Sequence, residues 1–100
     1  MKSIAQVAAI IEQCRDSSEQ RWEMALKTDD RDRNFHEDMD ECIQAYDDAL
    51  ESLDEAYEGY VEAARTALER AAVAERSGGD DQDAQRALAA LADLDPDADR

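Results

Sequence analysis

The fold is decided by residues 35–76, which read FHEDMDECIQAYDDALESLDEAYEGYVEAARTALERAAVAER. Apolar residues recur in this stretch at alternating spacings of three and four, which is the pattern of a heptad seam. Only Gly59 interrupts the pattern, and one glycine costs a helix about 1 kcal/mol relative to alanine, which a long packed helix can absorb. The stretch therefore predicts one continuous helix from about residue 35 to about residue 76. The predicted seam consists of bulky residues followed by alanines: Ile43, Tyr46, Leu50, Leu53, Tyr57, Tyr60, Ala64, Ala67, Ala71 and Ala74.

Two shorter helices are expected on either side of the long one. Residues 3–27 carry apolar side chains at helical spacing and form the first. A polar run over 28–33 follows, and Asn34 with Glu37 makes a capping box that starts the central helix. Ser77-Gly78-Gly79 ends the central helix, and Asp80 or Asp81 caps a third helix over about 81–94.

These lengths predict an all-α protein, a helical hairpin or three-helix bundle with coiled-coil-like packing around the long central helix. Residues 1–94 form a single domain, and 95–100 form an acidic tail that Asp95-Pro96 separates from the last helix and that we expect to be disordered. One layer of helices leaves apolar area uncovered, so a homodimer or a tight partner is expected on the seam. We expect Trp22 on the first helix to anchor this core or interface.

The composition excludes several partners. The chain of 100 residues has 27 Asp and Glu against 11 Lys and Arg, a formal charge of -16 and a pI of about 4.1. Nucleic acids and anionic membranes are polyanions and would repel such a protein. The N-terminus does not read as a signal peptide, and no apolar run is long enough to span a bilayer, so we expect a cytoplasmic protein. Cys14 and Cys42 fall at apolar helix positions and are expected to be reduced core residues, with a disulfide between them as the alternative.

Candidate chemistry is sparse. One segment matches the ligand positions of a calcium-binding loop: Asp30, Asp32, Asn34, Asp38 and Glu41. Phe35 stands where that loop needs a glycine, so a polar turn between helices is the preferred interpretation. A helical protein that responds to calcium or another metal is kept as a weaker hypothesis. His36 and Asp40 lie one turn apart, yet two ligands do not complete a zinc site. We therefore expect no metal, no cofactor and no enzymatic activity.

The charge is concentrated in one segment. Residues 34–64 hold eleven acids and no lysine or arginine, whereas residues 1–33 have a net charge of only -1. On one continuous helix, ten of these acids fall within an arc of about 140°, opposite the seam. Like charges one turn apart destabilise a helix, so a merely solvated face would contain lysines as well. We define the predicted acidic stripe as Asp40, Glu41, Asp47, Asp48, Glu51, Asp54, Glu55, Glu58 and Glu62.

The stripe suggests a function. Two such faces in a dimer would approach the charge density of duplex DNA. The leading hypothesis is a small acidic protein that blocks the basic nucleic-acid-binding surface of a partner by DNA mimicry. Inhibitors from phages and mobile elements, including anti-CRISPR and anti-restriction proteins, work in this way. The alternative is a dimeric coiled-coil adaptor that works through the seam, with Trp22 and the tyrosines as packing residues and the acids serving only solubility.

Overall fold

Four α-helices make up the described part of the chain, which in the computed structural model covers residues 2–28, 33–56 and 58–95. They are α1 (Ile4–Thr28), α2 (Arg33–Glu55), α3 (Tyr60–Ser77) and α4 (Gln82–Ala92). Among the described residues, the only strand-like pairing is an isolated bridge between Lys2 and Leu94. The all-α fold class is therefore confirmed, although the helices number four and not three.

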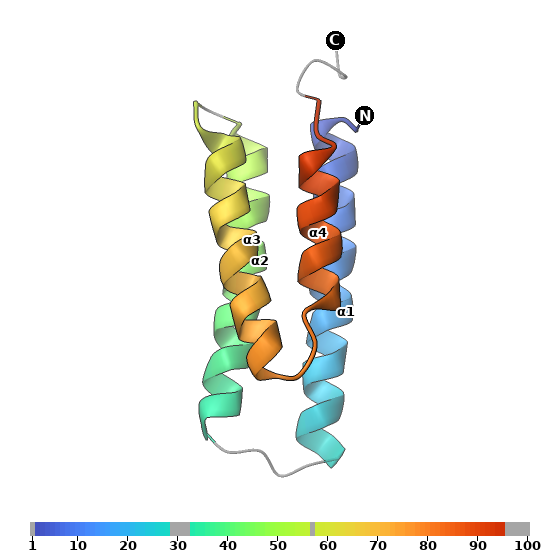
Figure 1. Ribbon diagram of the computed structural model, residues 1–100, viewed down its shortest axis with the longest axis vertical. Coiled ribbons are helices and arrows are strands. Elements are labelled where there is room, and N and C mark those ends of the chain that lie inside the picture. The colour runs from blue at the N-terminus through green and yellow to red at the C-terminus, as the bar shows by residue number, and fades with distance from the viewer. Residues whose placement is uncertain (1, 29–32, 57, 96–100) are drawn as a thin grey trace.

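The four helices form an up-and-down bundle. In Figure 1, α3 lies in front of α2 and α4 lies in front of α1, and successive helices run in opposite directions. Each helix packs against two others, in the cyclic order α1, α2, α3, α4. Short connections between antiparallel neighbours are typical of such bundles. The body is elongated, with extents of 49 × 19 × 16 Å.

The prediction of one continuous helix over residues 35–76 is wrong, because the chain reverses direction between Glu55 and Tyr60. Gly59 has a φ of 83° and Ala56 a φ of 48°, so two residues of this connection are left-handed. Glycine reaches that conformation without the clash that Cβ causes in other residues. Gly59 therefore permits the turn into α3 and is not a defect within a longer helix. The predicted seam folds back on itself.

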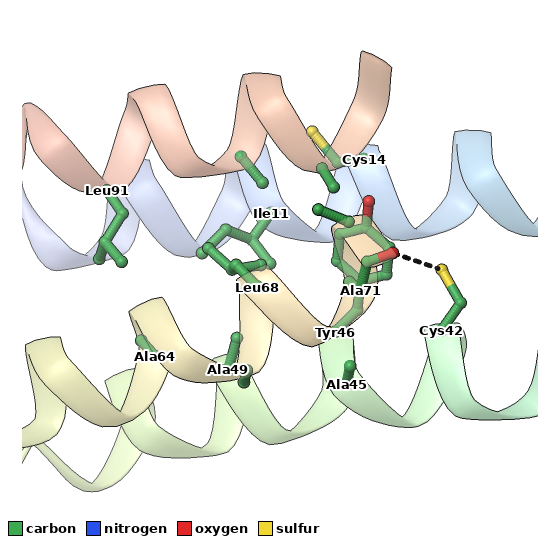
Figure 2. Packing of buried hydrophobic residues seen from close by; sticks show 14 of the residues in the cluster. Ile11, Cys14, Cys42, Ala45, Tyr46, Ala49, Ala64, Leu68, Ala71 and Leu91 are labelled. Carbon is green, nitrogen blue, oxygen red and sulfur yellow. Dashed lines mark hydrogen bonds between the residues drawn. The ribbon is translucent and has the colours of Figure 1, made fainter. Parts of the chain in front are cut away.

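Small residues fill the boundary between α2 and α3. Ala45 and Ala49 of α2 and Ala64 of α3 are fully buried, and Figure 2 places them along the line where these two helices run together. Side chains that end at Cβ let two helix backbones approach closely. The change from bulky residues to alanines along the predicted seam thus serves packing within one chain.

Larger side chains fill the space between the pair α2–α3 and the pair α1–α4. Each helix contributes at least one of them, and Figure 2 shows them spread along the space between the helices: Ile11 of α1, Tyr46 of α2, Leu68 of α3 and Leu91 of α4. All four are at most 3% exposed. Fully burying a side chain of this size contributes about 1.5–3 kcal/mol. The chain therefore has its own core.

The first and last helices along the chain, α1 and α4, have bounds close to those that the sequence predicts. α1 is displaced by one residue from the expected range 3–27, and α4 is shorter than the expected 81–94. The α3–α4 connection passes close to Trp22. A Cβ added to Gly78 would lie 2.7 Å from the Trp22 ring. Only glycine permits that approach, so Gly78 has a packing role in addition to ending α3.

The two ends of the described chain are joined. The Lys2 N–H donates to the Asp93 carbonyl at 2.8 Å, and the Asp95 N–H donates to the Lys2 carbonyl at 2.7 Å. These bonds hold the start of α1 beside the end of α4. Beyond Asp95, the tail for which disorder was expected lies outside the described residues.

The apolar area that motivated a dimer is largely covered within one chain. Tyr46, Leu53 and Trp22 are each at most 5% exposed. Among the described residues, the large apolar side chains that remain exposed are Met24 and Val73. The homodimer stays a prediction, but the uncovered seam no longer argues for it.

Candidate functional site

The outer face of α2 is almost entirely acidic. Nine residues of α2 with described side chains are exposed, and seven of them are Asp or Glu. We call these seven the acidic face: Glu37, Asp40, Glu41, Asp47, Glu51, Asp54 and Glu55. The other two exposed residues are His36 and Gln44.

The buried side of α2 sets the direction of this face. Cys42, Ala45, Tyr46, Ala49 and Leu53 are at most 1% exposed and recur at spacings of one, three and four. They form one apolar stripe, which points into the bundle. Because helix periodicity is fixed, the residues between them must point outward, and those are the acids.

Arginines from neighbouring helices lie on both edges of α2. Arg15 of α1 contacts Asp47, with 2.7 Å between Nε and Oδ1. Arg70 of α3 contacts Asp48 on the other edge, with 2.6 Å between Nη2 and Oδ2. Five other acids of the acidic face have no such partner among the described residues. Asp40, Glu41, Glu51, Asp54 and Glu55 form no ion pair with any residue that the structure describes.

Three members of the predicted acidic stripe do not belong to this face, and one of them, Asp48, lies on α2 but is only partly exposed. Glu58 lies in the connection after α2, and Glu62 lies in the first turn of α3. Glu62 also pairs with Arg65 at 2.8 Å. The single stripe from Asp40 to Glu62 is therefore wrong in its geometry, because it assumed one uninterrupted helix.

The concentration of acids is specific to α2. The nine exposed residues of α3 include two acids and three arginines, and the described exposed residues of α1 include three acids and one lysine. A surface adapted only for solubility would spread its charge over all helices. In this protein α2 alone carries nine of the 27 acids.

The predicted seam residues take up different positions. Tyr46, Leu53 and Trp22 are buried in the core, whereas Ile43, Leu50 and Tyr60 are partly buried. Tyr57 lies outside the described residues. The structure does not gather these side chains on one outward surface.

A buried polar cluster lies at the centre of the bundle and was missed by the sequence analysis. Glu75 of α3 is 1% exposed. Its Oε2 accepts hydrogen bonds from Tyr46 of α2 at 2.5 Å and from Ser18 of α1 at 2.8 Å. Its Oε1 accepts the backbone N–H of Ala84 of α4 at 3.0 Å. One carboxylate therefore connects all four helices.

A guanidinium lies beside this carboxylate. Arg21 of α1 is 3.7 Å from Glu75 and 2.7 Å from Asp83, and Asp83 is itself buried. A small hollow of about 50 Å³ opens next to Arg21, Trp22 and Gly78. Its volume suits little more than one or two water molecules. Two signals in the sequence pointed to the cluster: Glu75 falls on the apolar stripe of its helix, and the hydroxyl of a buried tyrosine needs a partner.

Both cysteines are buried free thiols, as expected. Burial raises the pKa of Cys14, and it raises the pKa of Cys42 to about 12. Reactive cysteines are thiolates in electropositive, accessible places. These two thiols are therefore suited to packing and not to nucleophilic chemistry.

The predicted cation site lies partly outside the described residues. Asp30 and Asp32 lie outside the described residues, as do the side chains of Asn34 and Phe35. His36 and Asp40 are both exposed on α2. Among the residues described, no group of three or more His, Cys, Asp or Glu side chains is arranged to hold a metal ion.

The chain matches no known family model, no curated protein and no solved structure. None of the helices in the described segments has both the length and the apolar character to cross a membrane.

Proposed function

We propose that this protein binds a basic surface of a partner protein through the acidic face of α2 and thereby keeps nucleic acid from that surface. The observation that carries the proposal is the composition of the face, on which seven of nine exposed residues are acids. Neutral residues would solvate α2 equally well. Like charges at these spacings cost stability, so their presence favours a role outside folding.

The spacing of the acids supports a phosphate-like role. The sequence of α2 contains nine acids in 23 residues, which extend over about 34 Å at 1.5 Å per residue. This corresponds to one carboxylate per about 4 Å, or one per about 5 Å without the arginine-paired Asp47 and Asp48, against about 3.4 Å per charge for a single DNA strand. A groove lined by Lys and Arg for a phosphate backbone would meet a similar charge density. No dimer is needed for this match.

The unpaired acids are the proposed contacts. They are Asp40, Glu41, Glu51, Asp54 and Glu55, and Glu58, in the connection after α2, is a further candidate contact outside the acidic face. Asp47 and Asp48 of α2 and Glu62 of α3 already have arginine partners and are not among the proposed contacts. Complementary charge speeds association and makes binding sensitive to salt.

The adaptor hypothesis has less support. It requires the seam to be a working surface, whereas Tyr46, Leu53 and Trp22 lie within the core of their own chain. An adaptor that used these side chains would have to open the bundle first.

Charge neutralisation tests the proposal. The triple variant E51Q/D54N/E55Q removes three charges from the acidic face, and the control E23Q/E69Q/D93N removes three from exposed positions on other parts of the molecule. Affinity capture from the native host at low and high salt, followed by mass spectrometry, compares both with the wild type. We expect the wild type and the control to retain the same nucleic-acid-binding proteins and the face variant to lose them. Equal capture by the face variant at physiological salt would refute the proposal.

A further inference from the structure

An apolar groove of about 630 Å³ lies beside the acidic face, between the first half of α1 and the end of α2. Its lining is apolar except at two positions. The apolar lining residues are Ile4, Ala5 and Ala8 of α1, Leu50 and Leu53 of α2, and Ala56 just after it. Glu12 and Asp54 are the two charged lining residues.

The groove is open because short side chains border it. Ala5 and Ala56 are exposed, and Ile4, Ala8 and Leu50 are only partly buried. No described residue of α3 or α4 lines the groove, and in Figure 1 these two helices lie in front of α2 and α1. An added side chain the size of leucine would bury apolar surface here that the chain leaves in contact with water.

The charge around the groove selects the occupant. Asp54 belongs to both the groove and the acidic face, and Glu51 and Glu55 are the exposed acids nearest to Asp54 in the α2 sequence, outside the groove lining. The nearby cations are engaged elsewhere: Arg15 pairs with Asp47, and Lys2 pairs with Asp93. A second copy of this chain would bring a further charge of -16, which does not complement the acids beside the groove. The occupant is therefore cationic as well as apolar.

We infer that this groove receives the apolar side chains of a basic amphipathic helix of the partner protein, while the Lys and Arg residues of that helix contact Glu51, Asp54 and Glu55. The groove follows α1 from Ile4 to Glu12, about 12 Å, which matches two turns of a docked helix. Apolar anchors at i, i+4 and i+7 are the usual way in which a helix occupies such a groove. This inference rests on the proposed function and adds the structure and chemistry of the partner segment.

Two synthetic peptides test the inference on the full-length protein. One is a helix of lysines and leucines with leucines at i, i+4 and i+7, and the other has the same length and charge with alanines in place of the leucines. Isothermal titration calorimetry should show the leucine peptide binding about tenfold more tightly, because only it fills the groove. A5Q, which places a longer polar side chain in the groove, should weaken the leucine peptide about fivefold or more. A89Q is the matched control, since Ala89 is also an exposed helix alanine but lines a different groove, between α1 and α4.

The outcomes separate this inference from the proposed function. The inference is wrong if the two peptides bind the wild type with equal affinity, bind E51Q/D54N/E55Q more weakly, and bind A5Q as tightly as the wild type. In that case the acidic face binds the peptides and the groove does not. If the leucine peptide binds the charge-neutralised triple as well as it binds the wild type, the proposed function fails although the groove is occupied. If neither peptide binds the wild-type protein, both the groove inference and the proposed function are overturned.

Discussion

The carboxylate of Glu75 lies in the middle of the bundle and accepts hydrogen bonds from Ser18, Tyr46 and the backbone of Ala84. Each donor comes from a different helix. A buried carboxylate is tolerated only where hydrogen-bond donors surround it. Removing the carboxylate or one of its donors leaves the remaining polar groups buried without a partner. Glu75 thus fixes how the helices of the bundle lie relative to one another.

Replacing Glu75 with alanine should lower the free energy of unfolding by about 3–5 kcal/mol, because Tyr46, Ser18 and Arg21 lose their common acceptor. Urea denaturation followed by circular dichroism measures the change. E69A is the control, since Glu69 is exposed on the same helix, and it should have little effect. Equal destabilisation by the two substitutions would contradict the cluster.

Alkaline pH should destabilise the protein through the same interior. Burial raises the pKa of Cys42 from 9.0 to about 12, and burial together with the hydrogen bond to Glu75 raises the pKa of Tyr46 above its ordinary 10.0. Both folded-state values exceed the unfolded ones, so the unfolded chain binds fewer protons once the pH passes about 9. Their contribution is complete below pH 9 and is lost as pH rises toward the folded-state values. The slope is at most about 1.4 kcal/mol per pH unit for each group.

Urea midpoints measured between about pH 8 and about pH 10.5 test this sign. The wild type should lose stability steadily above about pH 9, and C42A/Y46F should show a shallower decline even though it is less stable at pH 8. A decline of the same slope in both proteins would show that these two groups are not its cause.

At the scale of the elements, the decisive feature is the break between α2 and α3. A heptad pattern that continues through a reversal is indistinguishable in sequence from one long helix, because both helices place their apolar residues at the same spacing. Gly59 was the one available signal, and its left-handed conformation depends on the packing of two helices that the sequence does not specify locally. The ends marked by Gly78, Gly79 and Asp81 were predictable, since two glycines and a cap residue occur together there.

The substitution G59A distinguishes the two architectures by the sign of its effect. Within a continuous helix, alanine would stabilise by about 1 kcal/mol. With φ at 83°, alanine should instead destabilise by about 1–2 kcal/mol, because its Cβ clashes in the left-handed conformation. Chemical denaturation gives the sign, and a gain in stability would contradict the α2–α3 turn.

For the whole molecule, the sequence indicated where the charge lies but not its three-dimensional outline. The run of acids from Glu37 to Glu55 is on one helix, so helix periodicity alone placed it on one face. Predicting the positions of Glu58 and Glu62 would have required knowing that the chain turns between α2 and α3. Predicting the ion pairs of Arg15 and Arg70 would have required knowing which helices adjoin α2. The groove between α1 and α2 likewise depends on tertiary packing, which the spacing of apolar residues cannot define.

The acidic face should cost the molecule stability. E51Q/D54N/E55Q removes repulsion between neighbouring carboxylates, each pair of which costs a few tenths of a kcal/mol. At low ionic strength its thermal midpoint should therefore equal or exceed that of the wild type, and the difference should shrink as salt is added. A lower midpoint would mean that these acids support the fold, which would remove the main reason to assign them to binding.

The most direct test of the proposed function is a competition measurement on a basic partner captured from the host. Fluorescence anisotropy of a labelled DNA duplex bound to that partner reports displacement as the acidic protein is added. The wild type and E23Q/E69Q/D93N should displace the duplex at the same concentration, and E51Q/D54N/E55Q should require at least about tenfold more. Displacement by the face variant at the wild-type concentration, or a captured partner whose bound duplex is left in place, would contradict the account.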